Sequence, residues 1–450
     1  MNTLIQKYNV PGPRYTSYPT VPFWNAESFS KDQWVQSFQE TFHTTNKTEG
    51  ISLYIHLPFC ESLCTFCACH KHITKRHEVE HPYIQTVLRE WILYTKLMNE
   101  TPVIKEIHLG GGTPTFFSPE NLEVLIKGIL MRSQLAEDYE FSFEGHPNNT
   151  SREHLEALYN LGFRRVSFGV QDYNEKVQQA IHRIQPFEAV KKVTELAREI
   201  GYTSVSHDIV FGLPFQTLDC MVETINKTKS LQPDRISFYS YAHVPWVKGV
   251  GQRGFNEKDL PSGSEKRELY EVGKSMLFDL GYVEIGMDHF ALTSDELYTS
   301  SINGKLHRNF MGYTAQKTSL MIGLGMSAIS DSWGAFAQNV KTVKEYQTLV
   351  DQGEIPVFRG HILTQQDLEI RKHILNLMCR FETSWDLGFE EDILDETLLK
   401  ELEEDNLIGL TPNGVEIFEE GKPFVRNVCM TFDVYLQQKR TREKLFSLTV

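Results

Sequence analysis

The chain has 450 residues, of which 40% are hydrophobic and 23% are charged. This balance excludes a disordered or collagen-like chain and a small scaffold held by disulfides, and the length predicts two or three domains. A formal net charge of -14 offers no average attraction to nucleic acid or anionic lipid, so we expect neither as a partner. The longest apolar stretch, at 318–330, is too short to span a bilayer. The amino end has no secretory signal pattern, so we expect a cytoplasmic protein.

The chain divides into three predicted parts. Residues 1–50 are rich in Pro, Tyr, Thr and Asn, and their prolines interrupt helices, so we expect an extended N-terminal arm that lies on another surface. Residues 51–362 form the predicted barrel and its extension. From residue 363 the periodicity is helical apart from a strand-turn pattern at 409–417, which predicts a small, mostly helical C-terminal domain at 363–450.

Strand and helix patterns alternate through the second part. Strand patterns recur at 51–57, 103–109, 140–144, 165–171, 204–211 and 235–242. Helical patterns lie between them at 119–131, 151–161, 187–200 and 218–231. This alternation indicates right-handed βαβ crossovers and a parallel sheet. Six such units without a dinucleotide-binding fingerprint favour an α/β barrel or partial barrel over a doubly wound open sheet.

In such barrels the chemistry collects at the carboxyl ends of the strands. Five of the predicted ends carry polar or special residues, which are Cys60 onward, the run Gly110 to Thr113, Glu144, Gln171 and Asp208. A triple glycine lets the backbone approach a ligand closely, although it is equally common in plain turns. Glu144 faces the polar side of its strand, where it could hold an ammonium or ribose group or be a solvated carboxylate.

Four of the seven cysteines lie in one loop directly after the first strand, at Cys60, Cys64, Cys67 and Cys69. Three thiolates on such a loop can hold three corners of a [4Fe-4S] cluster and leave the fourth iron free for a small molecule. The alternative is a zinc site with Cys69 or His70 as fourth ligand, in a non-catalytic binding protein. Zinc ligands usually come as two separated pairs, and the chain has no second pair.

The C-x3-C-x2-C spacing of this loop after the first strand of a barrel resembles the signature of the radical S-adenosylmethionine superfamily. The resemblance implies that the amine and carboxylate of S-adenosylmethionine chelate the open iron. It also implies that one electron from the reduced cluster splits the sulfonium and yields a 5′-deoxyadenosyl radical. The protein would then orient the reactants and exclude water and oxygen.

Longer motifs narrow the resemblance to the oxygen-independent coproporphyrinogen III oxidase family. They lie at 12–20, 241–245, 286–290, 306–310 and 426–430, and Cys69 adds to them. The resemblance implies a partial (β/α)6 barrel with a helical C-terminal domain. It also implies decarboxylation of two propionates of coproporphyrinogen III to vinyl groups, which gives protoporphyrinogen IX in heme biosynthesis. Heme chaperones and heme-degrading methyltransferases on the same barrel are the alternatives, and they usually lack Cys69 and the motif at 14–20.

The same resemblance implies roles for individual residues. Cys60, Cys64 and Cys67 would bind the cluster, and Cys69 would be needed for activity without binding iron. His56 shares the polar face of the first strand with Tyr54 and is a second candidate catalytic residue. The residues implied for a first S-adenosylmethionine are Tyr54, Gly111, Glu144 and Ile329. Those implied for a second molecule are Phe66, Gly112, Thr113, Gln171, Arg183, Asp208 and Ala242.

The expected substrate carries four carboxylates, which an acidic protein must meet with local positive charge. We expect Arg14, His307 and Arg308 to supply charge-assisted contacts, with ordinary surface pairing as the alternative. The reaction requires a reductant such as flavodoxin or ferredoxin and an electron acceptor, and we expect a monomer. Met311 stands where the family pattern has Gln, so it can pack against a ring edge or fill core.

Overall fold

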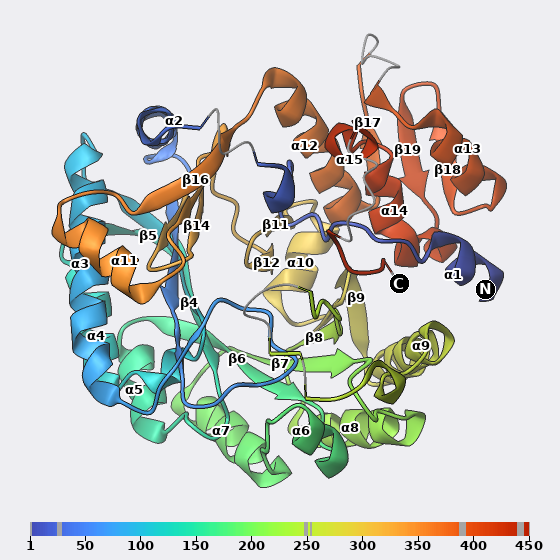
Figure 1. Cartoon of the computed structure of the whole chain (residues 1–450), viewed down its shortest axis with the longest axis horizontal. Helices are drawn as coiled ribbons and strands as arrows, with labels where there is room; N and C mark the ends of the chain where they lie inside the picture. The colour runs from blue at the N-terminus through green and yellow to red at the C-terminus, as the bar shows by residue number, and fades with distance from the viewer. Residues whose placement is uncertain are drawn as a thin grey trace.

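The computed structural model describes residues 2–24, 29–246, 251–252, 254–386, 393–438 and 445–449. In this part of the chain, twelve strands form one curved sheet in the order β16-β15-β14-β13-β1-β4-β5-β6-β7-β8-β10-β9 (Figure 1). The six central strands follow one another in chain order and run parallel. The sheet curves without closing, so the predicted partial barrel is confirmed.

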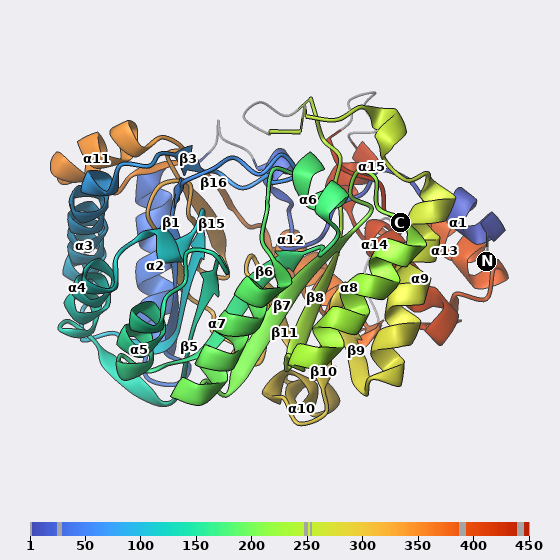
Figure 2. The same cartoon turned by 90° about the horizontal axis from the view of Figure 1, so that it is seen from below.

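The parallel strands are β1 (Ile51–Leu57), β4 (Val103–Gly111), β5 (Gln134–Gly145), β6 (Phe163–Gln171), β7 (Ser204–Phe211) and β8 (Arg235–Ser240). The helices beside and between them are α3 (Glu80–Leu97), α4 (Pro119–Leu130), α5 (Arg152–Asn160), α6 (Glu175–Ala180), α7 (Phe187–Ile200), α8 (Leu218–Leu231) and α9 (Gly263–Asp279). Most of these helices line the outside of the sheet (Figure 2). Because each strand returns through a helix, successive strands point the same way and their carboxyl ends share one edge.

Further strands extend the sheet at both edges. Beyond β1 lie β13 (Met321–Leu324), β14 (Ile329–Asp331), β15 (Ala335–Asn339) and β16 (Val357–Ile362). Beyond β8 lie β10 (His289–Leu292) and β9 (Tyr282–Gly286). The helices of this extension are α10 (Glu296–Ile302) and α11 (Val343–Asp351). Two small pairs complete it, β2 (Phe59–Cys60) with β3 (His72–Ile73) and β11 (His307–Asn309) with β12 (Gly312–Thr314).

The main core lies between the sheet and the outer helices. On β1, Leu53 and Ile55 are fully buried and belong to the same cluster as Val87 and Trp91 of α3. Because successive side chains of a strand alternate between faces, Tyr54 and His56 point to the inner side of the barrel. The strand pattern therefore sets which residues can reach a ligand inside the barrel.

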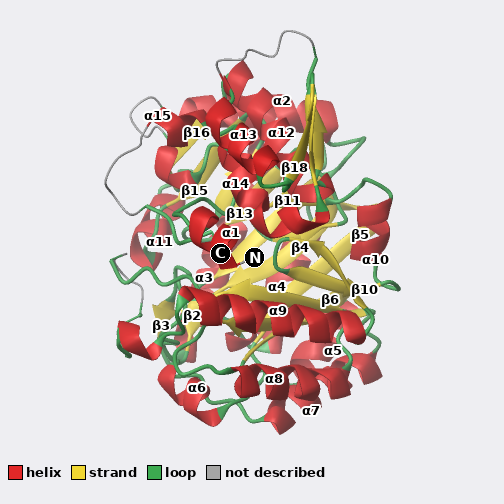
Figure 3. Ribbon diagram, turned by 90° about the vertical axis from the view of Figure 1, so that its right-hand side faces the viewer, coloured by secondary structure: helices red, strands yellow, loops and turns green. Residues whose placement is uncertain are grey.

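The C-terminal part is mostly helical and carries a small sheet, as expected from its pattern (Figure 3). Its helices are α12 (Gln365–Arg380), α13 (Glu396–Glu404), α14 (Val425–Met430) and α15 (Val434–Gln438). Its strands are β17 (Glu382–Ser384), β18 (Ile408–Thr411) and β19 (Gly414–Ile417). A separate core holds these elements together, with Leu377 and Phe432 fully buried in it.

The prediction of an extended arm over residues 1–50 is right only in part. Two helices lie in this segment, α1 (Asn2–Tyr8) and α2 (Lys31–Thr45). Ser30 and Gln33 form a capping box at the start of α2. Trp34, Phe38 and Phe42 then recur every four residues and are buried. The prolines interrupt only the stretch before α2, which leaves this later apolar face free to form a helix.

Between α1 and α2 the arm crosses the C-terminal part toward the barrel (Figure 1). Tyr15 and Tyr18 are almost fully buried in the C-terminal core. The Tyr15 hydroxyl donates to Asp433 over 3.1 Å, and Arg426 donates to the carbonyl oxygen of Pro13 over 2.8 Å. These contacts fix the backbone on both sides of Arg14. Among the described helices, none is long and apolar enough to cross a membrane.

Candidate active site

The carboxyl ends of the parallel strands surround a cavity of about 500 Å³. The predicted site residues that line it are Arg14, Phe66, Cys67, Cys69, Gly111, Gly112, Thr113, Glu144, Gln171, Arg183, Asp208 and Ala242. A neighbouring hollow of about 320 Å³ shares Cys67, Thr113 and Arg183 with this cavity and adds Cys60 and Cys64. The structure thus gathers residues from the arm and from six strand ends at one mouth of the barrel.

The three thiols of Cys60, Cys64 and Cys67 all face the smaller hollow. The Thr113 hydroxyl donates to the sulfur of Cys60 over 3.3 Å. Burial raises the pKa of the Cys60 thiol to about 11, whereas a hydrogen bond with Cys69 lowers the pKa of Cys67 to about 6. Among the described residues, no three His, Cys, Asp or Glu side chains lie close enough to hold one metal ion. Three separate thiols around a hollow fit three corners of an iron–sulfur cube.

His56 supports the cysteine loop from the inner face of β1. Its Nε2 donates to the carbonyl oxygen of His70 over 2.8 Å, and its Nδ1 lies 3.1 Å from the Tyr54 hydroxyl. Burial lowers the pKa of His56, which favours the neutral ring that these contacts require. A Cβ on Gly111 would lie 2.7 Å from Nδ1 of His56, and Gly111 has φ +113°. A side chain at position 111 would therefore clash with His56 even when no ligand is bound, so glycine is required there by the protein itself.

Glu144 ends β5 with its side chain 47% exposed. Its carboxylate and the Tyr54 ring converge over Gly110, where an added Cβ would meet them at 3.0 and 3.1 Å. The nearest hydrogen-bonding group is Nε2 of His108, at 3.5 Å from the carboxylate. This carboxylate consequently retains capacity to accept hydrogen bonds from a ligand ammonium group or hydroxyl in the cavity.

Arg183 reaches the mouth from the loop after α6. Its Nη2 donates to the carbonyl oxygen of Gly169 over 2.8 Å, and its Nη1 lies 3.9 Å from the sulfur of Cys64. Burial and the charge of Glu144 raise the pKa of Asp208 to about 6. Glu144 and Asp208 are therefore two carboxylates that face one cavity, an arrangement that suits a ligand with its own positive charges.

Five predicted site residues lie outside the lining of these two cavities, and three of them are Tyr54, His56 and Ile329. Tyr54 and His56 stand on the inner face of β1 beside Gly110 and Gly111. Ile329 of β14 packs against the apolar cluster that contains Trp24 and Phe336. Met311 lines a smaller cavity inside the barrel, which Glu144 and Asp208 also line.

The structure separates the three residues predicted to meet substrate carboxylates. Arg14 lines the main cavity, where its Nη1 lies 2.9 Å from Asp288. Arg308 is buried and donates to the carbonyl oxygen of Arg14 over 3.3 Å, so it supports the arm. His307 lines a different cavity, of about 830 Å³, near the amino ends of the strands. Neighbouring residues of a strand face opposite ways, so His307 and Arg308 cannot point to the same side.

The lining residues that were not predicted from the sequence include Lys71, His146, Tyr239 and Ser240. Lys71 donates to the carbonyl oxygens of Cys67 and Cys69 over 3.2 Å, and it lies two residues beyond the cysteine loop. His146, Tyr239 and Ser240 line the main cavity at or just after the ends of β5 and β8. The position of Tyr239 and Ser240 at the end of β8 is a signal that could identify them, because the carboxyl ends of parallel strands share one edge, and His146 lies two residues after Glu144.

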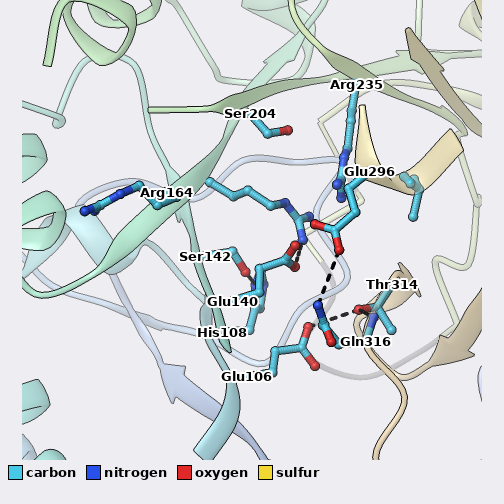
Figure 4. A network of polar contacts seen from close by, with 12 residues as sticks. Glu106, His108, Glu140, Ser142, Arg164, Ser204, Arg235, Glu296, Thr314 and Gln316 are labelled. Atoms are coloured by element: carbon cyan, nitrogen blue, oxygen red, sulfur yellow. Dashed lines mark hydrogen bonds and ion pairs between the residues drawn. The ribbon is translucent and has the colours of Figure 1, made fainter. Parts of the chain in front are cut away.

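At the amino ends of the same strands, polar side chains bind one another (Figure 4). The buried Glu106 accepts hydrogen bonds from Ser52 and Thr314 over 3.0 and 3.2 Å. The neighbouring ion pairs join Glu140 to Arg165 and Arg235 to Asp295. These contacts fill the base of the barrel with polar groups that mostly bind one another, and within the described residues Nη1 of Arg235 is buried without a hydrogen-bond partner.

Comparisons with known proteins agree with this geometry. The Radical SAM superfamily profile matches residues 54–228. The chain is 38% identical to the oxygen-independent coproporphyrinogen III oxidase of Synechocystis sp., and the match covers 99% of this chain and 97% of the relative. It is 39% identical to the Helicobacter pylori protein of the same name, with 99% and 98% covered.

A solved structure extends the comparison to the fold. The coproporphyrinogen III oxidase from Escherichia coli, described as a radical SAM enzyme, has a TM-score of 0.89 to this chain at 35% identity. The match covers 97% of this chain and 99% of that one. Both the barrel and the C-terminal part are therefore shared. The chain belongs to the oxygen-independent coproporphyrinogen III oxidase family of radical SAM enzymes.

Proposed function

We propose that this chain catalyses the oxygen-independent oxidative decarboxylation of two propionates of coproporphyrinogen III to vinyl groups, which gives protoporphyrinogen IX. The observation that carries the proposal is the gathering of three cysteine thiols, two carboxylates and Arg14 around adjoining cavities at one mouth. When bound, the [4Fe-4S] cluster and S-adenosylmethionine supply the carbon radical that removes hydrogen from the propionate. Family membership supports the same substrate class.

The position of each residue at the mouth indicates which group it would bind. Cys60, Cys64 and Cys67 would hold the cluster, since their thiols face one hollow. Glu144 would accept hydrogen bonds from the first S-adenosylmethionine, beside Tyr54 and Gly111. Asp208 and Arg183 would bind a second molecule on the other side of the cavity.

The remaining groups orient the reactants. His56 holds the backbone of the cysteine loop through His70, so it would position the cluster ligands. Cys69 donates to Cys67 and lines the main cavity, where it would reach the substrate side of the cluster. Arg14 would bind a substrate carboxylate by a charge-assisted hydrogen bond. The reductant would be a flavodoxin or ferredoxin acting on a monomer in the cytoplasm, with a separate electron acceptor.

The direct test is an anaerobic assay of the reconstituted and reduced protein with coproporphyrinogen III, S-adenosylmethionine and a one-electron acceptor. We expect release of carbon dioxide together with 5′-deoxyadenosine, and accumulation of protoporphyrinogen IX. Heme binding without decarboxylation would favour a heme chaperone and contradict the proposal. One colourless zinc per chain in place of about four irons would contradict it as well.

A further inference from the structure

A small cavity opens beside the main one, between α9 and the C-terminal part. It holds about 50 Å³, and it shares Arg14 and Ser240 with the main cavity. A water molecule takes roughly 30 Å³ of the liquid, so this space suits a group the size of a carboxylate. We term this cavity the annex. Its charged lining residues are Arg14, Lys266, Arg267, Glu284, Asp288, Lys422 and Arg426.

Most of these charges are neutralised by a partner. Salt bridges join Arg14 to Asp288, Arg267 to Glu271, Lys274 to Glu284 and Lys422 to Glu419. The exceptions are Lys266 and Arg426, which have no carboxylate partner among the described residues. Lys266 Nζ donates to the carbonyl oxygen of Tyr241 over 3.1 Å. Among the described residues, the guanidinium of Arg426 donates only to carbonyl oxygens of the arm and the C-terminal segment.

These two cations also oppose each other. Burial and the nearby Arg14 and Arg426 lower the pKa of Lys266 to about 8. Burial and Arg14 likewise lower the pKa of Arg426 to about 9. Asp288, which is paired with Arg14, is a nearby carboxylate whose charge opposes both pKa shifts. An anion in the annex would add a second negative charge beside Lys266 and Arg426 and would oppose both shifts further.

The side chain of Lys266 is held in place for such a contact. Its aliphatic stem lies against Gly212, which has φ +83°, and a Cβ there would meet the stem at 2.9 Å. With its stem packed and its ammonium beside the annex, Lys266 loses little conformational entropy on binding an anion. Arg14 stands at the junction of the annex and the main cavity.

We propose that the annex binds one carboxylate of coproporphyrinogen III and that Lys266 is its principal partner, a proposal that rests on the proposed function. The macrocycle carries four carboxylates, so a propionate away from the reacting one can anchor it. A carboxylate also exists on S-adenosylmethionine. The annex walls come from α9, the arm, the C-terminal segment, the ends of β7 and β8, and β9 with the turn after it. No residue of the cysteine loop lines them, which favours the substrate as the source.

The test compares Lys266→Met, which keeps the packed stem, with wild type and with Lys266→Arg, which restores the charge. We expect Lys266→Met to raise the KM for coproporphyrinogen III by roughly tenfold, with kcat and the KM for S-adenosylmethionine within twofold. Lys266→Arg should recover most of the affinity. Binding of fluorescent coproporphyrin III should weaken about as much, whereas the variant and wild type should bind its uncharged tetramethyl ester equally.

The matched control is Lys227→Met on α8, where the lysine is paired with Glu223, and its KM should stay within twofold. An unchanged substrate KM in Lys266→Met would overturn the annex proposal, as would a rise confined to S-adenosylmethionine. An equal loss of affinity for the tetramethyl ester would overturn it too. Inactive wild-type enzyme in the same assay would instead contradict the proposed function, so the two failures are distinguishable.

Discussion

Glu106 and Glu144 lie at opposite ends of the same parallel sheet, on neighbouring strands. Glu106 is buried at the base and accepts hydrogen bonds from two hydroxyl groups. Glu144 is half-exposed at the mouth, and its nearest hydrogen-bonding contact is 3.5 Å from His108. A buried carboxylate that accepts its hydrogen bonds from the protein has little capacity left for a ligand, whereas one left open beside a cavity can accept hydrogen bonds from a ligand. The difference indicates which end of the barrel performs chemistry.

The largest effect at the mouth should come from removing a thiol. Cys64→Ala takes away one of the three sulfurs around the hollow, so we expect loss of the cluster and no detectable decarboxylation. After anaerobic reconstitution, the iron and sulfide content measures the cluster, and the release of carbon dioxide measures decarboxylation. Cys220→Ala is the matched control, since Cys220 is a buried thiol on α8, and it should keep the cluster. A Cys64→Ala protein with full iron content and activity would refute this role.

The second largest effect is expected from removing the open carboxylate of Glu144. Glu144→Gln keeps the shape of the side chain but removes the charge that a ligand ammonium group would meet. We expect the Kd for S-adenosylmethionine to rise by roughly tenfold to a hundredfold, because hydrogen bonds to charged groups contribute that much. Equilibrium binding to the reconstituted protein measures it. Unchanged affinity would show that Glu144 is a solvated strand-end carboxylate.

A smaller effect is expected at the edge of the mouth. Arg14→Ala should raise the KM for coproporphyrinogen III by roughly tenfold, since it removes a charge-assisted contact. His307→Ala should change this KM by less than twofold, because His307 lines the cavity at the base. Steady-state kinetics on both variants decide the matter. A larger effect of His307→Ala than of Arg14→Ala would place the substrate at the base of the barrel and contradict the account.

At the base, the corresponding change should affect stability rather than catalysis. Burial and Glu140 raise the pKa of Glu106 from 4.5 to about 7. The folded state therefore keeps this proton between pH 4.5 and 7 while the unfolded state releases it, so the contribution to stability falls as the pH rises. The stability of Glu106→Gln relative to wild type should therefore increase by about 1 to 3 kcal/mol when the pH is raised from 5 to 8.

Urea unfolding of both proteins at the two pH values measures this difference, and the KM values of the variant should stay within twofold of wild type. A stability difference that is the same at pH 5 and pH 8 would contradict the raised pKa of Glu106. A large loss of S-adenosylmethionine affinity would contradict the separation of the two ends.

Local patterns in the sequence were enough to predict much of the barrel. The helices Phe187–Ile200 and Leu218–Leu231 and the strand Ser204–Phe211 have the bounds that their periodicity predicts. Strand β5 starts at Gln134, six residues before its predicted start, because its first part is acidic and exposed and lacks a buried face. The prolines before residue 23 predict an extended chain, but they do not reach α2, where Ser30 and Gln33 carry a capping signal.

The site was predictable where chemistry follows strand ends and much less so where distant segments meet. Glu144 and Asp208 could be placed at the mouth from the direction of their strands. His307 lies in a short hairpin, and its sequence pattern does not indicate which side of the hairpin faces the base of the barrel. Lys266 meets Arg14 and Arg426 only because the arm and the C-terminal segment fold against α9, which no local spacing encodes.

The most direct test of the contrast between the two ends is the electron paramagnetic resonance spectrum of the reduced, reconstituted protein with and without S-adenosylmethionine. The account predicts that the cluster signal changes on addition in wild type and in Glu106→Gln. At the same concentration it should change little in Glu144→Gln. A signal that ignores S-adenosylmethionine in wild type, or a response lost in Glu106→Gln and kept in Glu144→Gln, would contradict it.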